Sequence, residues 1–258
     1  MNTTETNTNG KASSWVLLVG ASSGIGRALA REFAAHGHNL LLAGRDMDDL
    51  ERSATDLRVR YGVAAQPVYV DALDQSKYQA FFDDCVAKAG GSLQGLVLAH
   101  GSLPLQEQVQ RDLALVEQTI DTNFTSFAAL LTLGANELEK HRSGFICVIS
   151  SVAGDRGRPS NYVYAAAKAG TTAFLQGLRS RMHKVGVSVL TVKPGYVDTA
   201  MIWGKPGVFL VASPERVAKD IYESVAAGKN EIYTPSFWKY VMLALKSIPE
   251  PMFKRMKT

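Results

Sequence analysis

Short apolar runs alternate with helical patterns along most of the chain, and this alternation restricts the fold more than any other feature of the sequence. Nearly continuous apolar runs are typical of parallel strands that helices cover on both faces. The segments between the runs are long enough for right-handed crossover helices. We therefore predict an α/β fold with one parallel sheet. The expected strands are WVLLV (15–19), NLLLA (39–43), QPVYV (66–70), GLVLA (95–99), FICVI (145–149), VSVLTV (187–192) and, as a seventh, EIY (231–233).

The sequence predicts one main folded domain. Its 258 residues, of which 46% are hydrophobic, can bury a sizeable core within the size range of a single α/β domain. No internal repeat or long linker interrupts the alternation, so we place this domain at 14–235. Residues 1–13 are rich in Asn and Thr and are expected to form a disordered arm. Residues 236–258 form an amphipathic, basic C-terminal segment.

The cysteines and the N-terminus favour a cytoplasmic protein. Cys85 and Cys147 lie in apolar stretches without the spacing of a metal site or a dense disulfide pattern, so we interpret both as reduced core residues. The chain does not begin with a basic region followed by an apolar one, as a secretory signal would. No stretch approaches the roughly 20 apolar residues that span a bilayer. A peripheral contact at the inner membrane face remains open for the C-terminal segment.

The charge distribution disfavours nucleic acid as a partner. The formal net charge is +4, and residues 237–258 hold five of the 28 Lys and Arg side chains but one of the 24 Asp and Glu side chains. The rest of the chain therefore carries equal numbers of basic and acidic groups. A nucleic-acid-binding domain would concentrate basic residues on its body.

A glycine-rich turn follows the first predicted strand. Gly20-Ala21-Ser22-Ser23-Gly24-Ile25-Gly26 leads directly into an amphipathic helical pattern that ends at Gly37. Glycines let the backbone pass close to a pyrophosphate, while free amides and the positive end of the helix dipole face its charge. Such a turn is a weak signal by itself, since a tight turn without any ligand would look the same.

The end of the second predicted strand indicates which dinucleotide is preferred. Ala43-Gly44-Arg45-Asp46 lies where such folds contact the adenosine ribose. A small residue followed by a cation leaves room and charge for a 2′-phosphate, so Arg45 favours NADP(H) over NAD(H). The alternative is that Arg45 is only solvated and Asp46 binds the ribose. Asp71, after the third strand, could contact the adenine or simply form a turn.

Tyr164 and Lys168 are the strongest catalytic candidates. They are one turn apart in a helical pattern, so phenol and ammonium share a face. A cation held beside a tyrosine favours the phenolate and would bring its pKa nearer to neutral. Ser151 follows an apolar strand, where its hydroxyl could reach a substrate carbonyl. Tyr162 is not a candidate, because Ala166 lies four residues after it.

Asn123 is expected inside a long helix, where asparagine is locally unfavourable. The alternatives for this residue are a functional role and an exposed position on the helix.

The order of Gly20-x-x-x-Gly24-Ile25-Gly26, Asn123, Ser151, Tyr164, Lys168 and Pro194-Gly195 resembles the short-chain dehydrogenase/reductase family. The resemblance runs from about residue 15 to residue 233. It implies a single Rossmann-type, doubly wound parallel sheet of about seven strands, hydride transfer at nicotinamide, and homodimers or homotetramers formed through the long helices.

The resemblance also assigns roles to particular residues. It implies that Tyr164 is the general acid/base and that Lys168 lowers its pKa and holds the nicotinamide ribose. By the same carry-over, Ser151 orients the carbonyl and Asn123 anchors a water of a proton relay, while the backbone at Tyr196 joins the nicotinamide contacts. The expected cofactor-binding residues are Gly20, Ser22, Ser23, Gly24, Ile25, Gly26, Arg45, Asp71, Ala99, Gly101, Tyr164, Lys168, Pro194, Gly195, Val197 and Thr199.

One segment departs from the family pattern. Leu98-Ala99-His100-Gly101 stands where the family commonly has Asn-Asn-Ala-Gly. His100 could contact substrate or cofactor, or it could be structural. More loosely, 150–170 and the C-terminal segment resemble reductases that act on decaprenylphosphoryl-2-keto-pentose. That resemblance suggests a bulky, lipid-linked carbonyl substrate.

Two functions follow from these patterns. The first is an NADPH-dependent carbonyl reductase, and the alternative is an NADP-sensing binding protein with the same fold and little turnover. The C-terminal segment also has two interpretations. Placed on a helix, Phe237, Tyr240, Val241, Ala244, Leu245 and Ile248 would form an apolar face, widened by Trp238 and Met242 and ended by Pro249 and Pro251. That face could meet an anionic membrane or pack within the protein.

Overall fold

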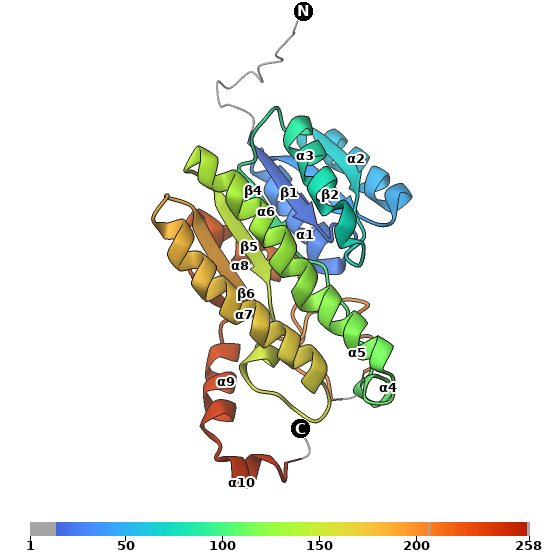
Figure 1. The fold of residues 1–258 in the computed structure, drawn as a ribbon, viewed down its shortest axis with the longest axis vertical. Coiled ribbons are helices and arrows are strands. Elements are labelled where there is room, and N and C mark those ends of the chain that lie inside the picture. The colour runs from blue at the N-terminus through green and yellow to red at the C-terminus, as the bar shows by residue number, and fades with distance from the viewer. Residues whose placement is uncertain (1–13, 206, 257–258) are drawn as a thin grey trace, which may run out of the picture.

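The structure, a computed structural model, describes residues 14–205 and 207–256 and contains one sheet of seven parallel strands (Figure 1). The strands lie in the order β3-β2-β1-β4-β5-β6-β7. All seven predicted strands are present, which confirms the predicted α/β fold. Their bounds are β1 Trp15–Val19, β2 Asn39–Gly44, β3 Ala65–Tyr69, β4 Gly95–Leu98, β5 Phe145–Ile149, β6 Ser188–Pro194 and β7 Glu231–Thr234.

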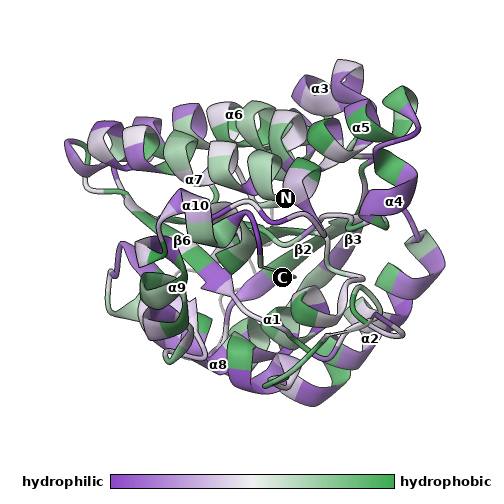
Figure 2. Cartoon of the chain, turned by 90° about the horizontal axis from the view of Figure 1, so that it is seen from below, coloured by the Kyte–Doolittle hydropathy of each residue, from purple (hydrophilic) through white to green (hydrophobic). Residues whose placement is uncertain are grey.

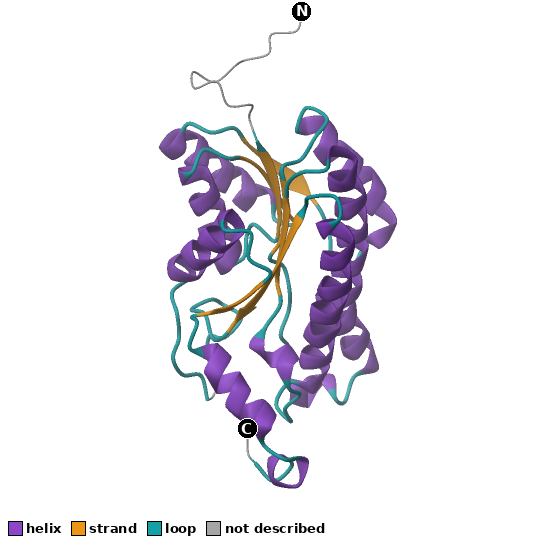
Figure 3. Ribbon diagram, turned by 90° about the vertical axis from the view of Figure 1, so that its left-hand side faces the viewer, coloured by secondary structure: helices purple, strands orange, loops and turns teal. Residues whose placement is uncertain are grey.

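Helices cover both faces of the sheet (Figure 3). One layer contains α1 (Gly24–Ala35), α2 (Met47–Tyr61) and α8 (Pro214–Ala226). The opposite layer contains α3 (Tyr78–Lys88), α5 (Leu113–Ile120), α6 (Ser126–His141) and α7 (Tyr162–His183), as the view along the sheet shows (Figure 2). The short helix α4 (Gln106–Val109) precedes α5. The termini of these helices follow glycine and capping signals in the sequence, such as Gly37 with a φ of 82° after α1.

Each face of the sheet has its own hydrophobic core. Because side chains alternate along a strand, Leu17 of β1 points to the core beneath α3, α6 and α7, whereas Leu18 points to the core beneath α1, α2 and α8. Cys85 lies in the first core and Cys147 in the second, and both thiols are free and buried. Burial raises the pKa of the Cys85 thiol to about 12. Both cysteines are therefore core residues, as predicted.

A turn of 3₁₀-helix (η3, Val152–Asp155) joins β5 to α7 and is held from two sides. Asp155 pairs with Lys193 at 2.9 Å and accepts a hydrogen bond of 2.6 Å from the Tyr233 hydroxyl. Both side chains of this ion pair are buried, with 5% of Asp155 and 6% of Lys193 exposed. These contacts tie η3 to β6 and β7 and so fix the position of Ser151 at its start.

The C-terminal segment packs against the body of the protein. It forms α9 (Trp238–Ser247) and the short α10 (Glu250–Phe253), and α9 ends before Pro249 as expected. Trp238 and Met242 are buried against Val152 of η3. The apolar face differs from the one we predicted, because Tyr240 is 70% exposed while Trp238 and Met242 are the most buried residues of α9. Packing against η3 turns the helix so that the residues expected at the edge of its apolar face lie at the centre of the contact.

Arg156, directly after η3, clamps the C-terminal segment. Its Nη1 donates hydrogen bonds to the carbonyl oxygens of Leu245 at 2.8 Å and Ile248 at 2.6 Å, and its Nη2 bonds to Glu250 at 3.1 Å. The guanidinium also lies 3.7 Å from the ring centroid of Phe253. The last carbonyls of α9 are therefore satisfied by a side chain from the Ser151 segment.

No helix among residues 14–205 and 207–256 has both the length and the apolar character needed to cross a bilayer. The arm expected at 1–13 lies outside the described residues.

We predict that Gly154→Ala destabilises the protein and that Gly157→Ala does not. A Cβ at Gly154 would lie 2.8 Å from backbone atoms of Lys168 and Ala169, so η3 would have to move away from α7. A Cβ at Gly157, in the same loop, would meet no atom within 4 Å. Overpacking of this kind typically costs about 1–3 kcal/mol. Urea denaturation of both variants checks this, and equal free energies of unfolding would contradict it.

Candidate active site

A cavity of about 490 Å³ lies at the carboxyl ends of the central strands, and a cleft of about 270 Å³ adjoins it. Ser22, Ser23, His100, Gly101 and Ser102 line both spaces. Sixteen of the predicted site residues line one or both, and two more lie behind them, as the next paragraphs describe. The cavity is lined by Ser22, Ser23, Gly24, Ile25, Ala99, Gly101, Ser151, Tyr164, Lys168, Pro194, Gly195, Val197 and Thr199, and the cleft adds Gly20, Arg45 and Asp71 to its share of these.

The strand order explains why these spaces lie together. The chain runs outward from β1 to β2 and β3 and then returns to β4 on the other side of β1. The loops after β1 and β4 therefore leave in opposite directions and open a crevice, which is where α/β sheets bind ligands.

The glycine turn after β1 is shaped by close backbone contacts. Gly20 has a φ of 86°, and a Cβ there would lie 2.4 Å from the backbone nitrogen of His100. A Cβ at Gly26 would lie 2.2 Å from the carbonyl oxygen of Gly20, which explains why Gly26 lies behind the loop and does not line either space. Ser23 caps α1 by accepting a 3.0 Å hydrogen bond from Gly26 N and donates one of 3.2 Å to the carbonyl of Ala99. The turn is thus fastened to both central strands.

Tyr164 and Lys168 lie one turn apart on α7, as predicted, and are 8% and 2% exposed. Lys168 Nζ donates a 3.0 Å hydrogen bond to the carbonyl of Ile149 and lies 5.8 Å from the centroid of the Tyr164 ring. Nζ also lies 4.4 Å from the centroid of the Phe127 ring, an interaction that favours the cationic form. Ser151, at the start of η3, accepts a 3.1 Å hydrogen bond from Ala153 N.

Burial dominates the ionisation of both groups. It raises the pKa of Tyr164 to about 12, although a hydrogen bond with Ser151 acts in the opposite direction. Burial lowers the pKa of Lys168 to about 7. We expected the cation to lower the pKa of Tyr164, and the structure differs because Nζ bonds to Ile149 while both groups lose contact with water. At neutral pH the phenol is therefore protonated, which suits a proton donor.

Asn123 lies in a π-helical turn (η2, Asp121–Thr125) between α5 and α6, so the regular helix expected here is interrupted. Its side chain is fully buried and committed to protein partners. Nδ2 donates 2.9 Å hydrogen bonds to the carbonyls of Ser102 and Thr119, and Oδ1 accepts one of 3.2 Å from Ser102 N. Asn123 does not line the cavity, and it fixes the loop after β4 that does. Of the two alternatives for this residue, the exposed helical position is wrong, and the water-anchoring role stays a prediction.

His100 is held by α6. Its Nε2 lies 2.9 Å from Ser126 Oγ, and its ring stacks on Phe127 with centroids 4.2 Å apart. Ser126 Oγ already donates to the carbonyl of Thr122, so Nε2 carries the proton and Nδ1 is an acceptor. Burial, together with the charge of Lys168, lowers the pKa of His100 to about 3. These contacts favour the structural role for His100, although the residue also lines the cavity and the cleft.

The cleft contains an unpaired cation at the end of β2. Arg45 is exposed, lines the cleft, and makes no ion pair or hydrogen bond with any residue that the structure describes. Asp46 uses its carboxylate to cap α2, accepting a 3.0 Å hydrogen bond from Asp49 N. Asp71 accepts a 3.0 Å hydrogen bond from Leu73 N and so forms the turn we allowed for, while still lining the cleft.

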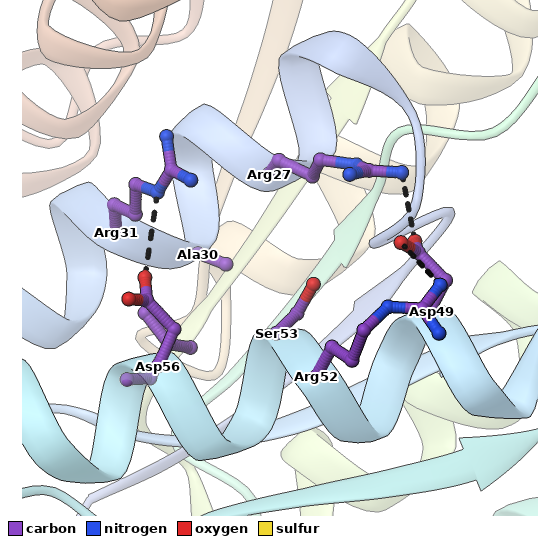
Figure 4. Close-up of a pocket in the computed structure, with 8 residues that line it drawn as sticks. Arg27, Ala30, Arg31, Asp49, Arg52, Ser53 and Asp56 are labelled. Carbon is purple, nitrogen blue, oxygen red and sulfur yellow. Dashed lines mark hydrogen bonds and ion pairs between the residues drawn. The ribbon is translucent and has the colours of Figure 1, made fainter.

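The neighbouring arginines are neutralised, in contrast to Arg45. A smaller cleft of about 200 Å³ lies between α1 and α2 (Figure 4). In it, Arg27 and Arg52 form ion pairs with Asp49 at 2.8 and 3.5 Å, and Arg31 forms one with Asp56 at 3.9 Å. These pairs join the two helices, so we interpret this cleft as a structural contact.

Sequence reasoning missed several residues that line the cavity. Ser102 and Leu103 follow β4, and Met201, Ile202 and Lys205 follow β6. The Lys205 ammonium donates a hydrogen bond to the carbonyl of Leu103 and so connects the two loops across the cavity. These residues belong to no motif, and only their position after two predicted strands could have indicated them. Among the residues that the structure describes, no cluster of His, Cys, Asp and Glu could hold a metal ion.

Known proteins share this fold and sequence. The model of the short chain dehydrogenase family matches residues 14–206. An uncharacterised oxidoreductase of Mycobacterium tuberculosis is 34% identical over 93% of this chain and 96% of its own length. A second, from Streptomyces coelicolor, is 31% identical over 93% and 95%.

Solved structures agree in fold. Actinorhodin polyketide ketoreductase with NADPH gives a TM-score of 0.78 at 22% identity, over 87% of this chain and 97% of that one. A short-chain dehydrogenase from Sphingobium yanoikuyae in complex with NADPH gives a TM-score of 0.75 at 25% identity, over 92% and 97%. The cavity, the fold and these matches lead to one conclusion: the chain belongs to the short-chain dehydrogenase family of oxidoreductases.

Proposed function

We propose that the protein is an NADPH-dependent carbonyl reductase, which transfers a hydride between nicotinamide and a ketone or secondary alcohol. The observation that carries this proposal is the meeting of Ser151, Tyr164 and Lys168 in one cavity with the glycine turn after β1. The cavity and the adjoining cleft together follow the crevice in which α/β folds bind dinucleotides. Ser22 and Ser23 of the turn line both spaces, where free amides at the start of α1 suit a pyrophosphate.

The chemistry divides between cofactor and protein. Bound NADPH supplies the hydride. Tyr164 Oη donates the proton that the carbonyl oxygen needs, and its raised pKa keeps that proton available at neutral pH. Ser151 Oγ orients the same oxygen. Lys168 sits close enough to stabilise charge that develops on the phenol during transfer, since a buried cation acts strongly in a low-dielectric site.

NADP(H) is the cofactor that Arg45 supports. A 2′-phosphate at the end of β2 would meet a guanidinium that has no other partner among the described residues. The carboxylate that could instead bind a free ribose, Asp46, is used to cap α2. The Sphingobium relative in complex with NADPH agrees with this assignment.

The alternative is a protein that binds NADP and turns over little. It shares the cofactor contacts but has no need of a buried Tyr164–Lys168 pair next to Ser151. Burying such groups costs free energy, and catalysis is the usual reason for accepting that cost. The reductase is therefore the function that this site supports better.

Three finer points stay predictions. A homodimer or homotetramer through the long helices α6 and α7 follows from family membership and is tested by sedimentation. A bulky or lipid-linked substrate, such as a keto-sugar lipid, follows only from the looser sequence resemblance. Cytoplasmic location follows from the cysteines and the N-terminal sequence. Contact at the inner membrane face depends on the C-terminal segment, which leaves Tyr240, Leu243 and Met252 exposed.

We predict that Tyr164→Phe lowers kcat/KM for ketone reduction by about 10²–10⁴-fold, because it removes the transferable proton but keeps the ring. Cofactor affinity should change little. Tyr162→Phe is the matched control, since Tyr162 is 45% exposed on the same helix and should retain full activity. NADPH oxidation measured at 340 nm with a panel of ketones checks both variants. Wild-type activity in Tyr164→Phe would refute the assigned proton donor.

We predict tighter binding of NADPH than of NADH, with Arg45→Ala weakening NADPH by about 1.5–3 kcal/mol and leaving NADH unchanged. Arg52→Ala is the control, because Arg52 is also an exposed cation near this end of the sheet but is paired with Asp49. Calorimetric titration gives all the affinities. Equal affinity of the wild-type protein for NADPH and NADH would show that Arg45 does not bind the 2′-phosphate.

We also predict co-sedimentation with anionic liposomes at low salt, lost in the double variant Tyr240→Ser/Leu243→Ser. Both side chains are exposed, at 70% and 59%, so their loss should leave the packing of Trp238 intact. Unchanged sedimentation of the double variant, or no binding by the wild-type protein, would leave the C-terminal segment with a purely structural role.

A further inference from the structure

A third cleft, of about 780 Å³, opens outward from the catalytic cavity. Leu103, Ile202 and Lys205 line both spaces, so the cleft and the cavity meet at these residues. None of the residues of the glycine turn lines this outer cleft, so a dinucleotide bound along that turn would leave it free. If the protein is the reductase proposed above, the outer cleft is where the part of the substrate beyond the carbonyl must go.

Gln106 places an unsatisfied donor in the wall of the outer cleft. The residue lines the cleft and is 6% exposed. Its Oε1 accepts a 3.3 Å hydrogen bond from Val163 N, which fixes the orientation of the carboxamide. Its Nε2 is buried and has no hydrogen-bond partner among the described residues. The side-chain oxygen of Gln106 therefore has a partner at the start of α7, whereas its NH2 group has none among the described residues.

Asn161 places an unsatisfied acceptor in the same wall. It lines the outer cleft at the N-cap position of α7, where an asparagine normally accepts a hydrogen bond from the first turn. Its side chain makes no such bond, and its Oδ1 is buried without a partner among the residues that the structure describes. Leaving a buried polar group unpaired is costly, so an asparagine that gives up its capping bond needs another reason to be there.

The two unpaired atoms, in residues that line the same cleft, have opposite hydrogen-bonding character. Gln106 Nε2 can only donate a hydrogen bond and Asn161 Oδ1 can only accept one, whereas a hydroxyl does both. The rest of the wall is largely apolar and includes Leu103, Pro104 and Val208. The Lys205 ammonium also lines the cleft and donates one of its three N–H groups to the carbonyl of Leu103.

We propose that the outer cleft binds the chain of the ketone substrate and that Gln106 and Asn161 select a ketone whose chain carries a hydroxyl group. This inference rests on the proposed reductase function. A plain alkyl ketone would leave both buried atoms unpaired, and sites built to bond a hydroxyl discriminate against analogues that lack it.

The test compares methyl ketones of increasing chain length with their ω-hydroxy counterparts, using NADPH oxidation by the wild-type enzyme. The hydroxy compound should be preferred about 5- to 10-fold in kcat/KM at one chain length, mainly through a lower KM, because a hydrogen bond adds an increment of this size. Scanning the chain length finds the spacing between the carbonyl and the two side chains.

Variants separate selection from structural support. Gln106→Leu and Asn161→Ala should each reduce the preference to below about 2-fold, mainly by raising KM for the hydroxy ketone. Gln106→Met, which keeps the length of the side chain, should do the same if Gln106→Leu lowers the melting temperature. Gln108→Leu, on the exposed side of α4, is the control and should retain the full preference.

Two results would overturn the inference. One is reduction of the plain ketones with no preference for a hydroxy compound at any chain length. The other is an equal loss of activity toward both ketones in Gln106→Leu and Gln106→Met, which would mean that Gln106 only supports the start of α7. Absence of turnover with every ketone would instead refute the reductase function on which the inference rests.

Discussion

The site depends on the reversal of strand order on either side of β1. Because β2 and β4 both pair with β1, the loops after β1 and β4 diverge at the carboxyl edge of the sheet. The backbones nevertheless touch there, since Gly20 leaves no room for a side chain beside His100. The other parts of the site are arranged around this contact. Helix α1 begins directly after the glycine turn, and η3 and α7 close the crevice from the side of β5. A parallel sheet with another strand order would bring these loops to different places.

Burial then determines what the site can do. The Tyr164 phenol and the Lys168 ammonium lose most of their contact with water, which raises the pKa of the former and lowers that of the latter. The two shifts keep the phenol protonated and place the ammonium close to its titration range at neutral pH. Two contacts hold the segment that carries Ser151. Asp155 forms a buried ion pair with Lys193, and Arg156 donates a hydrogen bond to a carbonyl of α9. The C-terminal helix thus packs against the segment that carries Ser151.

The fold could be predicted from the sequence almost completely. A sheet covered on both faces requires apolar runs at its strands, and tight turns require glycine, so both features can be recognised locally in the sequence. The site was predictable where chemistry follows a spacing, as for Tyr164 and Lys168. It was not predictable where geometry in three dimensions decides. Asn123 lies in a π-helical turn that no pattern indicates, and the apolar face of α9 turns to bury Trp238.

Gln106 shows the same limit at the outer cleft. It is a glutamine in a polar stretch of sequence, and only the structure reveals that its amide is buried in a residue that lines the outer cleft. The direction of the pKa shift of Tyr164 also required the structure, because the competing effects of burial and charge depend on where Lys168 Nζ makes its hydrogen bond.

The central claim is that this cavity transfers a hydride rather than only binding a dinucleotide. The most direct measurement is a single-turnover reaction with NADPH that carries deuterium at both hydrogen positions of C4 of the nicotinamide, with the product analysed by mass spectrometry. The account predicts deuterium on the carbinol carbon of the alcohol product. Tight binding of the cofactor, without deuterium in any product from the ketone series, would contradict it.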